Sequence, residues 1–441
     1  MRVAVVGCGY VGLVSGAGLA SIGHDVVGIE VDAGRREAIA AGRAPFHEPG
    51  LEELLRSVLE SGRFRVAGEI SAAAEAEVVL LAVQTPPDRT GAIDLSFLRE
   101  AARQVGETLS ARGGERAVVA VRSTVVPGTT AGVVAPALEG GAAAASNPEF
   151  LREGSAVADF VRPDRIVVGC DDEDGRELLR RLYEPLRAPI FFTTPATAEL
   201  AKYTSNAFLA TLISFSNEVA RISESIPGVD VEDVLEILHL DRRLSPELDG
   251  ATVRPAILSY LKAGVGYGGS CLPKDLSALL ATRRAAGFEH PLLDAVREVN
   301  ETQPGRVVGL AERELGGLDG RTVAVLGAAF KGGTDDLRSS PGLKVVDELL
   351  ARGARITLAD PLVAPERLSD YAARGVRIVT GLDEALEGAD AVVVTTNAPE
   401  WDELGAQLAA ADGGPVVVDG RRFLRPEALS GARYVAVGRG E

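Results

Sequence analysis

The stretch RVAVVGCGYVG (2–12) decides the fold of this chain. An apolar, β-branched run leads into Gly7, Gly9 and Gly12, which are spaced as GxGxxG, and a helical pattern follows at 10–22. The first glycine permits a tight turn, the second lets the backbone approach a pyrophosphate, and the third allows close packing of helix on strand. The N-terminus of the helix then faces the phosphates. The stretch therefore predicts a strand–turn–helix unit that binds a dinucleotide.

The segments that follow alternate between strand-like and helix-like patterns. Nearly continuous apolar runs predict buried parallel strands at 2–9, 25–32, 77–86 and 116–125. Further strands are expected near 142–146, 165–169 and 189–193, and helical spacing is present at 32–41 and 94–111. This alternation predicts a doubly wound α/β sheet.

The middle of the chain changes character. Residues 197–225 include no Gly or Pro and carry apolar residues at helical spacing, which predicts a helix long enough to connect two lobes. Further helical patterns lie at 230–240, 274–287 and 291–301. We therefore expect this region to be entirely helical.

A second alternating unit begins at RTVAVLGAAF (321–330). Its first helix is expected to start at Ser340 and Pro341, a capping hydroxyl followed by proline at the first helical position. More buried strands are expected at 354–360, 390–396 and 415–420. The expected fold is α/β, with two Rossmann-like doubly wound domains joined by a central helical domain that contains the long connecting helix. The expected boundaries are 1–196, 197–302 and 303–441.

The composition excludes several classes of function. A formal net charge of −17 argues against sequence-independent binding to nucleic acid or to acidic membranes. A phosphate ligand would then need a local cluster of Lys, Arg and backbone amides. No apolar run reaches transmembrane length, no cleavable leader is expected, and three cysteines in 441 residues are no disulfide framework. A cytoplasmic location is expected.

Glu30 ends the second predicted strand. An acidic side chain at this place accepts hydrogen bonds from the adenine-ribose hydroxyls and repels a 2′-phosphate, so NAD is favoured over NADP. A Rossmann-like domain that binds another nucleotide is the alternative. Arg35 could flank the ribose, or it could be an ordinary surface residue of the following helix.

Cys271 lies in the string GYGGSCLPKD (266–275). The thiolate is the nucleophilic form of cysteine, and glycine backbone amides together with Lys274 could stabilise it. The alternative is a packed structural cysteine in a tight turn. The glycines indicate that a ligand or another backbone comes close. Cys8 and Cys170 are expected to be small buried residues.

The base that serves such a thiol is expected to be a carboxylate. The histidines, at 24, 47, 239 and 290, lie in unrelated contexts, so a Cys–His hydrolase is disfavoured, and the absence of paired Cys/His spacing predicts no metal site. The candidates are Asp275 and the two glutamates of NPEFLREG (147–154), Glu149 and Glu153. That string follows a predicted strand, where doubly wound folds place their sites.

Lys202 and Asn206 stand four residues apart within the predicted long helix and so share one face. An ammonium and a side-chain amide together could hold an oxyanion. The alternative is a solvated surface pair.

These motifs resemble the UDP-glucose/GDP-mannose dehydrogenase family, nearly end to end. The strings that carry the resemblance are GCGYVG (7–12), STVVPGTT (123–130), NPEFLREG, the helix of Lys202 and Asn206, GYGGSCLPKD and FKGGTDDLRSSP (330–341). The resemblance implies an N-terminal NAD domain at 1–196, a helical bridge at 197–302 that dimerises and carries part of the active site, and a C-terminal domain at 303–441 that holds the nucleotide of a sugar substrate.

The resemblance also implies a reaction. A nucleotide sugar's C6 alcohol is oxidised to a carboxylate with two NAD per turnover, through a thiohemiacetal and a thioester on the cysteine. UDP-glucose to UDP-glucuronate, a step toward polysaccharides or glycosides, is the leading expectation. The alternatives are the same chemistry on dTDP-glucose or GDP-mannose, a two-electron hydroxyacid dehydrogenase, and a non-catalytic nucleotide-sugar sensor. A homodimer or higher homo-oligomer is implied.

Roles for individual residues come from the same resemblance. It makes Cys271 the nucleophile, Lys202 and Asn206 the stabilisers of oxyanion and alkoxide, and Asp275 with Thr124 and a water the acid–base group. Glu149 and Glu153 match carboxylates near the substrate and the nicotinamide. The implied cofactor contacts are Gly7, Gly9, Val11, Gly12, Glu30, Arg35, Thr85, Thr124, Glu153, Lys274 and Arg338. The implied nucleotide-sugar contacts are Glu149, Phe150, Leu151, Lys202, Asn206, Tyr260, Gly268 and Lys331.

The chain departs from the family's pattern in three places. Glu30 stands where Asp is commoner, and GAAFKGG replaces the usual GLAFKP. The stretch 240–264 is longer than the corresponding family segment. It leaves open whether Arg242, Arg243 or Arg254 is the family's substrate arginine.

Overall fold

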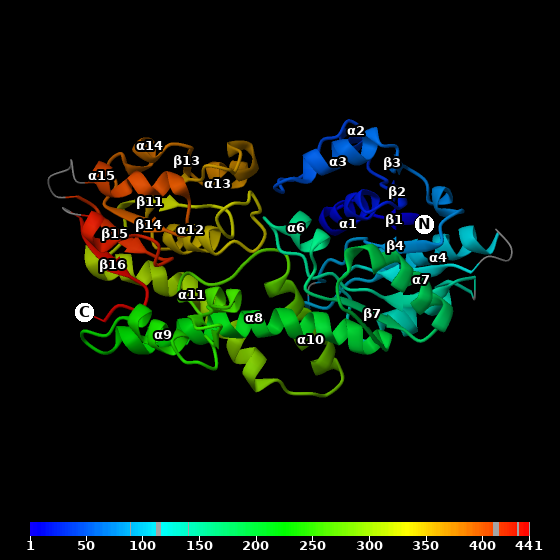
Figure 1. The fold of residues 1–441 in the computed structure, drawn as a ribbon. Coiled ribbons are helices and arrows are strands. Elements are labelled where there is room, and N and C mark those ends of the chain that lie inside the picture. The colour runs from blue at the N-terminus through cyan, green and yellow to red at the C-terminus, as the bar shows by residue number, and fades with distance from the viewer. Residues whose placement is uncertain (89, 112–115, 140, 409–413, 430–431, 441) are drawn as a thin grey trace. The chain divides into compact units, whose positions relative to one another are not determined.

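The computed structural model describes residues 1–88, 90–111, 116–139, 141–408, 414–429 and 432–440 (Figure 1). Its backbone contacts separate into two compact units. The first comprises Met1–Ser205 with Ser277–Phe288, and the second Asn206–Leu276 with Glu289–Glu441. The three domain boundaries expected from the sequence stay a prediction.

The first unit is built on a sheet in the order β3-β2-β1-β4-β5-β6-β7-β8. Its strands are β1 Arg2–Val6, β2 Asp25–Ile29, β3 Phe64–Ala67, β4 Val78–Leu81, β5 Val118–Val121, β6 Ala143–Ser146, β7 Ile166–Cys170 and β8 Ile190–Thr193. Every expected strand is confirmed, and β3 is an additional edge strand. Its pairs are parallel except β6 with β7, which are antiparallel. Because β1 lies between β2 and β4, the order of the sheet reverses at the end of β1, where doubly wound folds bind their ligands.

Helices cover both faces of this sheet (Figure 1). They are α1 Tyr10–Ser21, α2 Ala33–Ala40, α3 Leu51–Glu60, α4 Ser96–Ser110, α5 Ala135–Ala137, α6 Ala156–Val161 and α7 Glu173–Tyr183. Successive residues of β1 serve opposite faces, because side chains alternate along a strand. Val3 and Val5 join a core with residues of α1, α3, α6 and α7, whereas Ala4 and Val6 join a core with residues of α4.

The long connecting helix is α8, Pro195–Glu224, and it confirms the helix expected at 197–225. It starts two residues earlier than expected, with a proline, which is tolerated in the first helical turn because its missing N–H would have no partner there. The helix contributes residues to both units.

The remaining helices of the middle region are α9 Val231–His239, α10 Leu272–Ala285 and α11 Pro291–Leu315. Two expectations were wrong here. The region is not entirely helical, because β9 Glu247–Leu248 and β10 Ala251–Thr252 form a short antiparallel hairpin. The last helix does not end near 301 but continues past Pro304 to Leu315, since Pro304 and the residues after it bury an apolar face that offsets the lost hydrogen bond.

The second unit contains a parallel sheet in the order β13-β12-β11-β14-β15-β16. Its strands are β11 Thr322–Leu326, β12 Arg355–Ala359, β13 Arg377–Val379, β14 Ala391–Val394, β15 Val416–Asp419 and β16 Arg433–Ala436, and its helices are α12 Pro341–Ala351, α13 Ser369–Ala373, α14 Leu382–Leu386 and α15 Leu404–Leu408. The hydroxyl of Ser340 accepts from the amides of Gly342 and Leu343, so the expected cap is confirmed. Residues of α8, α9, α11 and α12 pack on one face and residues of α14 and α15 on the other.

Candidate active site

The turn after β1 is shaped for a dinucleotide. Gly7 has φ +91°, and a Cβ added there would lie 2.7 Å from the carbonyl oxygen of Ala82, while one added to Gly12 would lie 1.9 Å from that of Gly7. Gly9 caps α1 without a side-chain hydrogen bond, and a Cβ on it would meet no described atom within 4 Å. The start of α1 therefore faces open space with its first amides available to a phosphate, so the residues fit the cofactor.

Glu30 lies beside this turn. Its buried carboxylate accepts from the amide of Cys8 at 3.3 Å on Oε2 and from that of Asp32 at 3.0 Å on Oε1. Each carboxylate oxygen has more than one lone pair, so these bonds fix the group without exhausting its capacity to accept from a ribose hydroxyl. Burial, and next the charge of Glu30, raise the pKa of Cys8 to about 12, and Cys170 is also buried with a raised pKa. Both cysteines are the buried residues that were expected.

The other candidate cofactor residues of the first unit lie in different elements and differ in their exposure. Thr85, after β4, donates its hydroxyl to the carbonyl oxygen of Thr124, after β5, at 3.0 Å. This bond joins the loops that follow two neighbouring strands. Val11 is partly buried on α1, Glu153 is partly buried in the loop after β6, and Arg35 is exposed on α2. Their contacts with a cofactor stay predictions.

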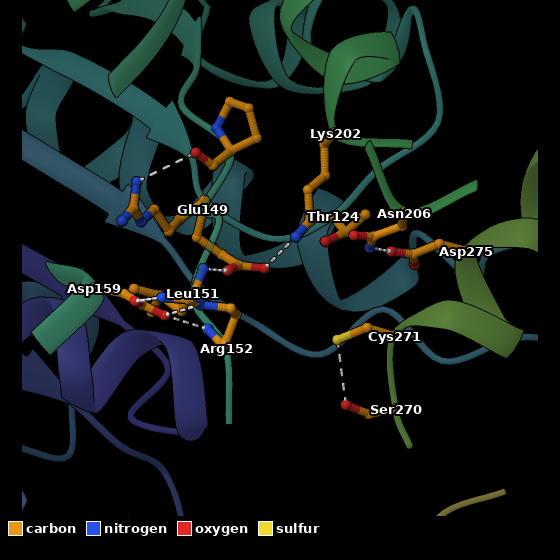
Figure 2. Close-up of polar contacts among 12 residues, drawn as sticks. Thr124, Glu149, Leu151, Arg152, Asp159, Lys202, Asn206, Ser270, Cys271 and Asp275 are labelled. Atoms are coloured by element: carbon orange, nitrogen blue, oxygen red, sulfur yellow. Dashed lines mark hydrogen bonds and ion pairs between the residues drawn. The ribbon is translucent and has the colours of Figure 1, made fainter. Parts of the chain in front are cut away.

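A buried ion pair follows β6. Lys202 Nζ lies 3.0 Å from Glu149 Oε1, and each side chain is only 5% exposed (Figure 2). The amide of Leu151 donates to Glu149 Oε2 at 2.6 Å, and the ammonium lies 5.4 Å from the ring centroid of Phe150. Burial by itself would raise the pKa of Glu149, but Lys202, the Leu151 amide and the charge of Arg122 outweigh it and lower that pKa.

This arrangement corrects one reading of the sequence. Lys202 and Asn206 are not a solvated surface pair, because both are buried. Each has its own carboxylate: Lys202 pairs with Glu149, and Asn206 Nδ2 donates to Asp275 Oδ2 at 2.6 Å. A buried ion pair is an expensive way to stabilise a fold, which favours a functional reason for Lys202 and Glu149.

Cys271 stands immediately before the first residue of α10, and its side chain is exposed. Its Sγ lies 3.4 Å from the hydroxyl of Ser270 (Figure 2). One helical turn later, Asp275 is only 1% exposed and accepts from Asn206 and from Lys274 Nζ, each at 2.6 Å. The alternative of a packed structural cysteine is therefore wrong. An accessible thiol stands one helical turn from a buried carboxylate, which accepts hydrogen bonds from a side-chain amide and an ammonium.

The glycines before Cys271 pack against another stretch of backbone in the same unit. A Cβ added to Gly268 would lie 2.3 Å from the carbonyl oxygen of Ser339, and one added to Gly269, whose φ is +81°, would lie 2.9 Å from the ring of Phe330. The amide of Gly269 donates to the carbonyl oxygen of Arg338 at 2.9 Å. The strings GYGGSCLPKD and FKGGTDDLRSSP, far apart in the sequence, are thus brought together.

Further candidates lie in the second unit. Tyr260 ends the short helix η4 (Ala256–Tyr260), and Arg338 pairs with Asp336. Lys331 lies in the loop that begins FKGG, with Nζ 5.5 Å from the ring centroid of Phe330. The side chains of the three candidates for a substrate arginine are all at least half exposed. Each forms an ion pair with a carboxylate: Arg242 with Glu247, Arg243 with Asp241 and Arg254 with Glu236. The structure singles out none of them.

Arg421 is a candidate that the sequence reasoning missed. It follows β15 and donates through Nε to the carbonyl oxygen of Thr395 at 2.7 Å and through Nη2 to that of Phe330 at 2.8 Å. Burial lowers its pKa to about 10, so it stays charged at neutral pH, and within the residues described no carboxylate pairs with it. Its position at the carboxyl end of a central strand was the available signal.

Two general properties bear on the kind of site. In the described parts of the chain, no group of three or more His, Cys, Asp or Glu side chains is placed to hold a metal ion. None of the described helices is both long and apolar enough to span a lipid bilayer.

Comparison with known proteins covers most of the chain. Residues 1–187 match the NAD binding domain of the UDP-glucose/GDP-mannose dehydrogenase family, residues 196–302 its central domain and residues 324–426 its UDP binding domain. A UDP-glucose 6-dehydrogenase of Haloferax volcanii is 39% identical, with 96% of this chain and 97% of that protein covered.

Solved structures agree with this. A UDP-glucose dehydrogenase from Pyrobaculum islandicum is 41% identical with a TM-score of 0.89, covering 100% of this chain and 98% of the other. A UDP-D-ManNAc dehydrogenase from Pyrococcus horikoshii is 29% identical with a TM-score of 0.85, and both chains are covered completely. NAD is accordingly the cofactor of this protein. The chain belongs to the UDP-glucose/GDP-mannose dehydrogenase family.

Proposed function

We propose that this chain oxidises the C6 alcohol of a nucleotide sugar to a carboxylate, with UDP-glucose as substrate and UDP-glucuronate as product. The observation that carries the proposal is the exposed thiol of Cys271, one helical turn from the buried carboxylate of Asp275. A simple two-electron dehydrogenase needs no such thiol, and a nucleotide-sugar sensor needs neither the thiol nor the carboxylate beside it.

The thiol supplies the covalent step. NAD, when bound at the glycine turn, accepts the hydride of each of the two oxidations. After the first, the Cys271 thiolate forms a bond to C6 of the aldehyde, whose oxygen takes up a proton, and the resulting thiohemiacetal keeps the reactive aldehyde attached. The second oxidation leaves a thioester. Water then adds to C6, the carbon–sulfur bond breaks, and the acid leaves with the cysteine restored. One alcohol, one water and two NAD give one carboxylate, two NADH and three protons.

The surrounding polar groups handle protons and developing charge. We assign proton transfer to Asp275, acting through a water with Thr124, because Asn206 and Lys274 fix its carboxylate. We assign stabilisation of the alkoxide and oxyanion to Lys202 and Asn206. Their support is that both are buried and lie one turn apart on α8. Glu149 holds the ammonium of Lys202 in place.

The nucleotide is assigned to the second sheet. Lys331 and Arg421 follow the ends of β11 and β15 and supply the local positive charge that a diphosphate needs on a chain of net charge −17. The match of residues 324–426 to a UDP binding domain favours UDP. The hexose is less constrained, because the relatives named above act on different sugars, and dTDP-glucose or GDP-mannose is the runner-up.

A homodimer is part of the proposal. Phe208, Phe215 and Ile222 recur every seven residues along α8 and are 53%, 49% and 57% exposed, so one face of the helix carries an apolar stripe. Phe215→Asp is expected to shift the protein toward monomer in sedimentation velocity, whereas Phe97→Asp, at an exposed position of α4, is expected to leave its mass unchanged. We place the protein in the cytoplasm because three cysteines in 441 residues are too few for a disulfide framework.

The test combines a stoichiometry with a variant. Purified protein is incubated with limiting UDP-, dTDP- or GDP-sugar, and NADH is counted against acid formed. Two NADH per acid are expected, and a ratio of one would favour the two-electron dehydrogenase. Cys271→Ala is expected to abolish acid while still binding the nucleotide sugar, and Cys170→Ala is the matched control. Normal turnover by Cys271→Ala would refute the thiol mechanism.

A further inference from the structure

Glu48 has no role in the chemistry described so far, yet its buried carboxylate is among the most engaged in the first unit. It lies in the segment between α2 and α3. Its Oε2 accepts from the hydroxyl of Tyr10 at 2.5 Å and from the amide of Gly154 at 2.8 Å, and its Oε1 accepts from the amide of Ala156 at 2.7 Å. One carboxylate thus receives three donors from two distant parts of the sequence.

The two parts are the two ligand-bearing segments of this unit. Tyr10 is the first residue of α1 and belongs to the glycine turn that fits NAD. Gly154 ends the string NPEFLREG, which carries Glu149, and Ala156 begins α6 two residues after Gly154. Glu48 therefore connects the cofactor turn to the loop that is assigned to the sugar.

Tyr10 is contacted both at its ring and at its hydroxyl. Its ring lies 5.0 Å from that of Phe46, centroid to centroid, so Phe46 contacts the ring and Glu48 accepts from the hydroxyl. Burial, the hydrogen bond to Glu48 and the nearby charges of Glu48, Glu153 and Glu149 raise the pKa of Tyr10, which keeps its hydroxyl protonated as a donor.

A buried carboxylate is tolerated only when donors satisfy it, so all three bonds must be made together. A shift of the glycine turn that moves Tyr10 changes the position at which Glu48 can also satisfy Gly154 and Ala156. We propose that Glu48 is a positioning residue that couples the two ligands, so that NAD in its turn and a nucleotide sugar on NPEFLREG each raise the affinity for the other. The identity of the second ligand rests on the proposed function.

The experiment measures binding, because a ratio of affinities separates coupling from general damage. NADH and UDP-glucose do not react with each other, so NADH fluorescence gives its Kd with and without saturating UDP-glucose. In the wild-type protein UDP-glucose is expected to tighten NADH binding at least about five-fold, the lower end of usual coupling. In Tyr10→Phe and in Glu48→Gln the ratio is expected to fall below about two-fold. The double variant is expected to match the single ones, because all of them interrupt one connection.

The controls separate the outcomes. Tyr10→Phe keeps the ring against Phe46, so it remains informative if Glu48→Gln folds poorly, and Glu53→Gln, an exposed glutamate of α3, is expected to keep the wild-type ratio. A wild-type ratio near one, or variants that weaken both ligands without changing the ratio, would overturn the coupling and leave the proposed function intact. If no UDP-, dTDP- or GDP-sugar binds the wild-type protein, the proposed function fails and the coupling fails with it.

Discussion

Gly268→Ala should disturb both the stability and the chemistry of the second unit. The added methyl carbon would lie 2.3 Å from the carbonyl oxygen of Ser339, 2.7 Å from Cδ of Pro341 and 3.1 Å from Cβ of Phe330. The first distance is about 1 Å shorter than an ordinary carbon–oxygen contact. These atoms belong to backbone, to a proline ring and to a Cβ, so no flexible side chain can move aside. Either the segment GYGGSCLPKD or the segment FKGGTDDLRSSP must therefore shift.

The size of the effect follows from overpacking. Inserting a methyl group into a filled site costs about 1–3 kcal/mol, and the absence of a movable neighbour puts this case near the upper end. For a unit of this size about 3 kcal/mol corresponds to a fall of Tm of roughly 6–12 °C. The same shift displaces Cys271, three residues later, and Lys331. We expect the KM for the nucleotide sugar to rise on the order of ten-fold, which corresponds to a loss of about 1.4 kcal/mol of binding free energy.

Thermal and urea unfolding, followed by steady-state kinetics, measure both effects. Gly309→Ala is the matched control, because a Cβ there would meet no described atom within 4 Å and the residue lies within α11. Alanine favours helix over glycine, so the control is expected to gain about 0.5–1 kcal/mol and to keep its KM. A Gly268→Ala protein with the wild-type Tm and KM would refute the packing of GYGGSCLPKD on FKGGTDDLRSSP.

Three further outcomes are expected. Glu149→Gln should lose on the order of 3 kcal/mol of stability at pH 7, because it removes the Glu149 anion from the buried ammonium of Lys202. Since the pKa of Glu149 is lowered, its stabilisation is fully present above about pH 4.3 and is lost as pH falls through the lowered pKa, so the difference in urea midpoints between wild type and variant should shrink only below about pH 4.3. Glu30→Ala should weaken NAD binding and relax discrimination against NADP; an unchanged preference in titrations would remove Glu30 from the ribose site. Arg421→Met should raise the KM for the nucleotide sugar ten-fold or more with a small change in kcat, and a loss confined to kcat would contradict its assignment to the diphosphate.

Local patterns were enough to predict most of the fold. The apolar runs around β1, β2, β4 and β5 report burial on both faces, which is itself the mark of a parallel sheet. The edge strand β3 escaped because it has only four residues, of which only Phe64 is fully buried, and its short alternation of polar and apolar residues resembles a loop. The continuation of α11 through Pro304 escaped because a local rule says that proline ends a helix, and the tertiary burial that overrides the rule is not visible in the sequence.

In the candidate site, too, local patterns could be read from the sequence, whereas contacts between distant parts of the chain could not. Spacing within one string was readable, so Cys271 and Asp275 could be selected as candidates four residues apart in GYGGSCLPKD. The partner that a side chain contacts could not be read from the sequence where it comes from a distant part of the chain. Nothing near Asn206 indicates that its amide is taken up by Asp275, and nothing near Gly268 indicates that the methyl group it lacks would collide with Ser339. The glycines could be read as room for a ligand or for another backbone, and at Gly268 a backbone fills the room.

Lys202 in the first unit and Arg421 in the second have different hydrogen-bond partners, and we expect this difference to separate their tasks. Lys202 forms a close pair with Glu149, so at a distance the two charges largely cancel, and what remains is an ammonium held in one orientation. Such a group can act on an oxygen that comes within hydrogen-bond distance, which is the role we propose for it toward the developing alkoxide. Arg421 is held by carbonyl oxygens, which orient the guanidinium without cancelling its charge. We therefore expect Arg421 to attract a diphosphate before contact, so its loss should appear in ground-state binding, whereas the loss of Lys202 should appear in kcat.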